Sequence, residues 1–176
     1  MRRPLDRERL LLFLRALAAE APAETRLYLT GGATAVLLGW RASTIDVDVK
    51  LEPESDRLLR AIPALKERLE MNVELRSSPG DFIPQLPGWR ERSPFAGREG
   101  KLSFHHYDLA AQALAKIERG HAQDLGDVRE MLARGLVGRD ELLSAFAQIE
   151  PLLYRYPAIA PAAFRSAVMN AASTVT

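Results

Sequence analysis

The feature that most constrains the fold is the segment from Thr44 to Leu51, in which polar and apolar side chains alternate without exception. A period of two is typical of a β-strand that places one face in the core and the other toward solvent. The segment therefore predicts a one-sided strand, with an apolar face made by Ile45, Val47, Val49 and Leu51.

The opposite face of this strand carries two aspartates, Asp46 and Asp48, although aspartate is depleted in strands. Residues two apart share a face and lie about 7 Å apart along the strand, so their carboxylates repel each other. A divalent cation would turn that repulsion into attraction, and ligands that are all oxygen suit Mg²⁺ or Mn²⁺. The alternative is a half-exposed strand whose polar face includes two acidic residues.

Hydrophobic periodicity and the Pro and Gly breakers predict an α/β (α+β) fold, a mixed sheet flanked by helices and followed by a helical part. The boundaries are 1–107 for the core and 108–176 for the helical part, together forming one compact unit. Strands are expected at 26–30, 44–51, 72–76 and 101–107. Helices are expected from Pro4, at 33–40, 54–70, 108–119, 122–134 and 140–154, and after 157–161. Pro63 should bend or split its helix, and 77–100 reads as a long loop.

Composition removes several function classes. The chain has no cysteine, which excludes disulfides, thiolate metal sites and cysteine nucleophiles and favours a cytoplasmic location. Its net charge of +1 gives no global attraction to nucleic acid or to a membrane. Charged residues such as Arg9 and Arg15 flank the first apolar run closely, so neither a signal peptide nor a membrane span is expected there.

Gly31 and Gly32 lie between the expected strand 26–30 and the helix that follows it. Without side chains, such a turn lets a phosphate approach the backbone amides and the helix amino terminus. A Gly-Gly pair alone is more often a tight turn. Its combination with Arg41, Thr44 and the two aspartates is more specific.

The stretch GGATAVLLGWRASTIDVDV, residues 31–49, resembles the signature of the DNA polymerase beta-like nucleotidyltransferase superfamily. In that superfamily a strand, a Gly-Gly or Gly-Ser turn, a helix and a strand bearing Asp-x-Asp form the active site. The form R-x-S-T-x-D-x-D looks most like bacterial proteins related to abortive-infection toxins of the type IV toxin–antitoxin class. The resemblance implies Mg-dependent transfer of a nucleoside monophosphate from a nucleoside triphosphate to an RNA (such as tRNA), protein or small-molecule acceptor, and an antitoxin partner.

A second stretch, YDLAAQALAKIERGHAQDLGDVREML, is similar to later motifs of those toxins, which contribute a lysine and an aspartate. The matching residues are Lys116 and Asp124. Taken without the resemblance, Lys116 lies in a polar stripe that reads as the solvated edge of a helix. Asp124 would then complement the helix dipole from the first turn.

The resemblance also implies individual roles. Asp46 and Asp48 would hold the metal, and phosphate contacts would come from Gly31, Gly32, Arg41, Thr44 and Lys116. Many members use a third carboxylate to activate the acceptor, for which Glu74 is the first candidate and Asp81 the second. If Glu74 is only a solvated strand residue, a catalytically silent nucleotide-binding or protein-interaction module is the alternative function.

Two further groups of residues have competing interpretations. His105 and His106 are adjacent in a strand and should face opposite ways, which argues against a zinc site. Trp89 lies in the expected loop with several basic residues, namely Arg90, Arg92, Arg98 and Lys101. This group could stack on and contact an RNA acceptor, or the tryptophan could simply be packed.

Overall fold

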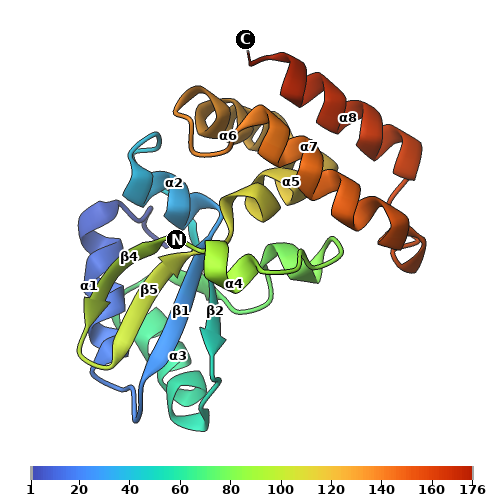
Figure 1. Ribbon diagram of the computed structural model, residues 1–176. Helices are drawn as coiled ribbons and strands as arrows, with labels where there is room; N and C mark the ends of the chain where they lie inside the picture. The colour runs from blue at the N-terminus through green and yellow to red at the C-terminus, as the bar shows by residue number, and fades with distance from the viewer. Residues whose placement is uncertain (1, 176) are drawn as a thin grey trace. The chain divides into compact units, whose positions relative to one another are not determined.

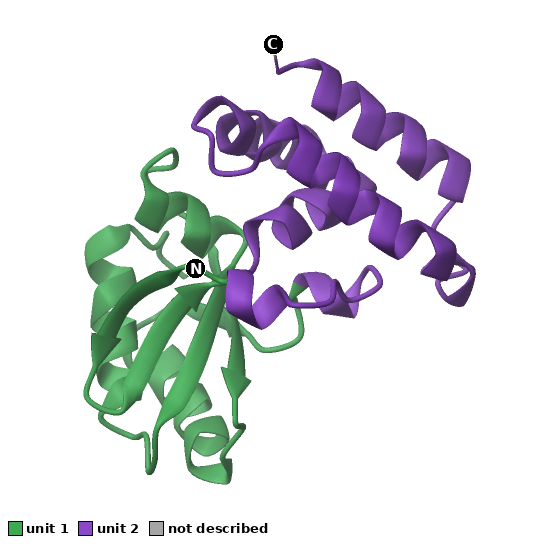
Figure 2. Ribbon diagram, viewed as in Figure 1, with its two compact units in different colours: residues 1–78, 93–106 green, residues 79–92, 107–176 purple. Residues whose placement is uncertain are grey.

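The computed structural model describes residues 2–175, which divide into two compact units (Figure 2). The first unit comprises residues 1–78 and 93–106, and the second comprises 79–92 and 107–176. The division after His106 falls one residue from the boundary expected at 107, but residues 79–92 belong with the second unit. The mixed α/β fold with a helical C-terminal part is confirmed.

The first unit is built on a five-stranded mixed sheet of order β3-β2-β1-β5-β4 (Figure 1). Its strands are β1 (Thr25–Thr30), β2 (Asp46–Glu52), β3 (Asn72–Glu74), β4 (Phe95–Glu99) and β5 (Leu102–His106). Its helices are α1 (Arg7–Ala18), α2 (Gly32–Leu38) and α3 (Asp56–Arg68). β1 pairs antiparallel with β2 and parallel with β5, and β2 pairs parallel with β3. The α3 crossover between β2 and β3 is the connection that a parallel pair requires.

One face of this sheet forms the core of the unit with α1 and α3. Val47, Val49 and Leu51 of β2 are buried there, as the alternation predicted. Helix α1 begins after Asp6, whose side chain accepts a hydrogen bond from the Arg9 amide. The two aspartates of β2 consequently lie on the opposite face.

Several local features predicted from the sequence differ in the structure. Ile45 precedes the strand and is 67% exposed, so it is not part of the apolar face. Helix α3 continues through Pro63 without a split; that residue is on the exposed side, where a helix tolerates a lost hydrogen bond best. The strand expected at 72–76 ends at Glu74. The expected loop 77–100 contains β4, a 3₁₀ turn η1 (Pro79–Asp81) and a short helix α4 (Trp89–Arg92).

The second unit is helical. Besides η1 and α4 it contains α5 (Leu109–Arg119), α6 (Ala122–Ala133), α7 (Arg139–Ile149), the 3₁₀ segment η2 (Glu150–Arg155) and α8 (Pro161–Ser173). Helix α5 packs against α6, α7 and α8, and Phe146 of α7 meets Phe164 of α8 edge to face. Asp108 begins α5 by accepting from the Ala110 amide. None of the helices within residues 2–175 combines the length and hydropathy needed to cross a membrane.

Candidate nucleotide and metal site

The polar face of β2 is the base of the candidate site. Asp46 and Asp48 are both half-buried and share this face, while Val47 between them is fully buried. Asp48 pairs with Thr30 at the end of β1 on one side and with Glu74 of β3 on the other. Neighbouring strands are about 4.8 Å apart, so Glu74 is the carboxylate-bearing residue directly beside Asp48.

The turn between β1 and α2 brings the glycine pair against these residues. Gly31 has φ of +63°, and a Cβ there would lie 2.8 Å from Asp48 Oδ2. A Cβ at Gly32 would lie 2.1 Å from Thr44 Oγ1 and 3.3 Å from an Arg41 guanidinium nitrogen. A side chain at either position would have to displace these neighbouring atoms, so both positions require glycine. Five of the predicted residues lie together around this turn: Gly31, Gly32, Arg41, Thr44 and Asp48.

Thr44 is held in place by the backbone as well as by its side chain. It exchanges two backbone hydrogen bonds with Leu5, at 2.6 and 2.9 Å. Its hydroxyl donates to the Asp46 carbonyl at 3.1 Å. This bridge fixes the chain just before β2 and so orients the first aspartate.

Asn72 is a member of this site that the sequence reasoning missed. Its Nδ2 donates to Asp46 Oδ1 at 2.5 Å and, more weakly, to Glu74 Oε1 at 3.4 Å. Ser77 Oγ donates to the other oxygen of Glu74 at 2.9 Å. The β2-α3-β3 crossover could have predicted that these two strands pair in parallel, but the register that places Asn72 opposite Asp46 is known only from the structure.

Lys116 and Asp124 belong to the second unit, where they form an ion-pair network. Lys116 Nζ lies 2.7 Å from Asp127 Oδ2 and 3.6 Å from Asp124 Oδ1, and all three side chains are at most 7% exposed. Arg119 donates two hydrogen bonds to Asp124, at 2.7 and 2.6 Å. The solvated edge expected for Lys116 is wrong, because Lys116 itself is buried. Asp127 was not singled out from the sequence.

Charge within this network decides the ionisation of Asp124. Burial alone would raise its pKa, but the hydrogen bonds and charge of Arg119 and the charge of Lys116 together lower it below the ordinary value. Asp124 also lies in the first turn of α6, as predicted. Asp81, the second candidate for a third carboxylate, is an exposed residue of η1 in the second unit.

The two histidines of β5 face opposite sides of the sheet, as predicted. His106 is on the core side, where its Nδ1 lies 3.1 Å from the Thr34 hydroxyl, and burial lowers its pKa to about 4. His105 is on the other side with Tyr28, and burial lowers its pKa as well. Each ring is therefore neutral near pH 7.

Trp89 is packed rather than available for stacking on a base. It is 2% exposed and lies against the Tyr107 ring, with centroids 4.3 Å apart and planes 9° from parallel. Arg92 pairs with Asp108 in the same unit, and Arg98 of β4 pairs with Glu24. The segment expected as a loop is therefore structured, and the alternative of a packed tryptophan is the one observed.

The two carboxylates on the polar face of β2 are the residues that would hold a magnesium-type ion. Within residues 2–175 no group of three or more His, Asp or Glu side chains is arranged to hold a metal. Mg²⁺, however, is commonly bound by one or two carboxylates plus substrate phosphates and water, without a full protein cage. Asp46 and Asp48, with the Gly31 turn against Asp48, supply that partial set.

Comparisons with protein-family models, with curated proteins and with solved structures found no match for this chain. They consequently add no argument for or against the resemblance of residues 31–49. The functional conclusion depends on that motif and on the geometry of the first unit, in which the glycine turn and the strand aspartates lie together.

Proposed function

We propose that this protein is a metal-dependent nucleotidyltransferase that moves a nucleoside monophosphate from a nucleoside triphosphate to an acceptor hydroxyl. The observation that supports this most is the approach of Asp48 Oδ2 to the Gly31 turn, on the strand face that Asp46 shares. A phosphate chain and its metal would use such a combination of a glycine turn and neighbouring carboxylates.

Each residue then has a definite task. Asp46 and Asp48 would hold Mg²⁺ or Mn²⁺, which when bound neutralises phosphate charge and polarises the attacking hydroxyl. Gly31 and Gly32 carry no side chain, so Asp48 and Thr44 can lie directly against the turn whose backbone amides would contact the phosphates. Arg41, whose guanidinium lies against Gly32, offers positive charge to the same phosphates.

Acceptor activation is assigned to Glu74. It is the strand neighbour of Asp48, and it is exposed enough to meet an acceptor. Its carboxylate already accepts hydrogen bonds from Ser77 and Asn72, which hold it in one orientation. A carboxylate so placed can take the proton of the attacking hydroxyl.

The test is incubation of the protein with each α-labelled nucleoside triphosphate, Mg²⁺ or Mn²⁺, and cell extract. Asp46→Asn and Asp48→Asn should each abolish labelling, whereas Asp140→Asn, at an exposed position of α7, should leave it unchanged. Digestion of the labelled product with ribonuclease or protease identifies the acceptor class. Labelling that survives both strand substitutions would refute the proposal.

A second function, nucleotide binding without transfer, is favoured by two observations. Glu74 is occupied by Ser77 and Asn72, and residues 2–175 contain no three-residue metal cluster. In that case a nucleoside triphosphate would bind in the presence of Mn²⁺, and binding would be lost in Asp48→Asn, but no label would be transferred.

The resemblance to abortive-infection toxins extends the proposal to an RNA acceptor such as tRNA and to an antitoxin partner. Expression of the wild-type chain in a bacterial host should then slow growth, and Asp46→Asn should relieve the effect. Equal growth of the two strains at equal protein levels would argue against a toxin while leaving the transferase assay to stand.

A further inference from the structure

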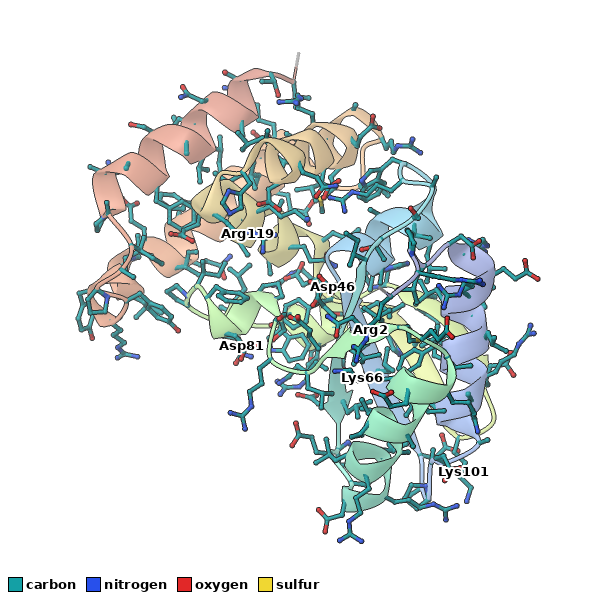
Figure 3. The ribbon with its side chains drawn as sticks, turned by 180° about the vertical axis from the view of Figure 1, so that it is seen from behind. Arg2, Asp46, Lys66, Asp81, Lys101 and Arg119 are labelled. Atoms are coloured by element: carbon teal, nitrogen blue, oxygen red, sulfur yellow. The ribbon has the colours of Figure 1, made fainter. Side chains whose placement is uncertain are left out.

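Asn72 is at the centre of a chain of hydrogen bonds that reaches the candidate metal ligand. Arg2 Nη1 donates to Asn72 Oδ1 at 2.8 Å, and Asn72 Nδ2 donates to Asp46 Oδ1 at 2.5 Å. The same Nδ2 lies 3.4 Å from Glu74 Oε1. Figure 3 labels Arg2 and Asp46, the two ends of the chain that Asn72 joins.

The orientation of the Asn72 amide follows from its neighbours. A guanidinium can only donate, and an ionised carboxylate can only accept. The amide oxygen must therefore face Arg2 and the amide nitrogen must face Asp46, because the flipped amide would place oxygen against two carboxylates. Arg2 fixes the side chain that in turn fixes Asp46.

We infer that Asn72 is a positioning residue for the proposed metal site: it holds Asp46 by Oδ1, which would leave Oδ2 available to bind the ion. This inference rests on the proposed function. Asparagine suits the task because its amide donates to a carboxylate without cancelling the negative charge, which a lysine would do. Partners of this kind orient ligands in metal sites and commonly change metal affinity by tenfold or more when they are removed.

The experiment measures the Mn²⁺ dissociation constant and the Mn²⁺-induced shift in melting temperature of the full chain without substrate. The variants are Asn72→Ala, which removes the donor, and Asn72→Asp, which replaces it with an acceptor of the same shape. Asn170→Ala, at the other asparagine of the chain, is an exposed control in α8. Arg2→Ala removes the outer donor at an exposed terminal residue and leaves the strand untouched.

A positioning role has a distinct pattern. Asn72→Ala should weaken Mn²⁺ binding about tenfold, and Arg2→Ala should weaken it less. Asn72→Asp adds a carboxylate that repels Asp46 until an ion binds, so its Mn²⁺-induced shift should be larger than that of the wild type, by about 2 to 4 °C. Asn170→Ala should match the wild type in both measurements.

Other outcomes separate the two proposals. If the wild type binds Mn²⁺, Asp46→Asn abolishes binding and the Asn72 variants bind as tightly as wild type, the inference is overturned while the metal site stands. If the Asn72 variants do not fold, an unchanged dissociation constant in Arg2→Ala overturns it. If the wild type binds no Mn²⁺ even with a nucleoside triphosphate present, the proposed function and the inference fall together.

Discussion

Removal of the buried ammonium of Lys116 should strongly destabilise the second unit. In Lys116→Met the unbranched side chain is one atom shorter and loses its charge, which leaves Asp127 without the ammonium 2.7 Å away and Asp124 with its hydrogen bonds from Arg119. Breaking a buried pair by removing one partner costs about 3 to 5 kcal/mol, because the remaining charge stays out of water. With a urea m-value of about 2 kcal/mol/M, the unfolding midpoint should fall by about 1.5 to 2.5 M.

The assay uses the two tryptophans of the chain, Trp40 and Trp89, which lie one in each unit. In a Trp40→Phe background, fluorescence of Trp89 against Tyr107 reports urea unfolding of the second unit. This choice of probe avoids assuming that the two units unfold together.

The matched control is Arg134→Met, which breaks an ion pair with Glu130 in the same unit. These side chains are 43% and 47% exposed, so the loss should be about 1 kcal/mol or less. Adding Asp127→Leu to Lys116→Met should recover part of the larger loss, because the buried carboxylate that Lys116 paired with is then also removed. The reasoning is refuted if Lys116→Met shifts the midpoint no more than Arg134→Met does.

Two further predictions concern Gly32 and His106 of the first unit, each with a control position in the second unit. Gly32→Ala places a Cβ 2.1 Å from Thr44 Oγ1 and should destabilise by about 1 to 3 kcal/mol in urea unfolding. Gly126→Ala, inside helix α6, is the control. Its added Cβ would meet only a side-chain atom at 3.8 Å, so this substitution should raise the free energy of unfolding by about 0.5 to 1 kcal/mol. Equal effects would contradict the packing argument. His106 has a pKa of about 4 in the folded protein against 6.5 ordinarily, so the unfolded chain takes up the proton first as the pH falls. The contribution of neutral His106 to the free energy of unfolding is therefore present above pH 6.5 and is lost toward pH 4, by up to about 3 kcal/mol. His106→Asn should make the melting temperature less dependent on pH over that range, whereas the control His121→Asn, at an exposed position, should not.

The sequence predicted most elements of the fold because each depends on a local pattern. Strand β2 follows from its alternation, and the ends of α5 follow from Asp108 before it and Gly120 after it. Where the prediction failed, a long-range contact decided the outcome. Strand β4 exists only because β5 pairs with it, and Trp89 is ordered by stacking on Tyr107.

By itself, the sequence determined those parts of the candidate site whose residues are close together in the chain. Asp46 and Asp48 share a face because a strand has a period of two, and the glycine pair precedes them by a fixed number of residues. Only the tertiary structure decided that Asp48 approaches Gly31, that Asn72 holds Asp46, and that Lys116 is buried between two aspartates. Strand register and helix packing join residues far apart in the chain, and no local pattern encodes the distance between their side chains.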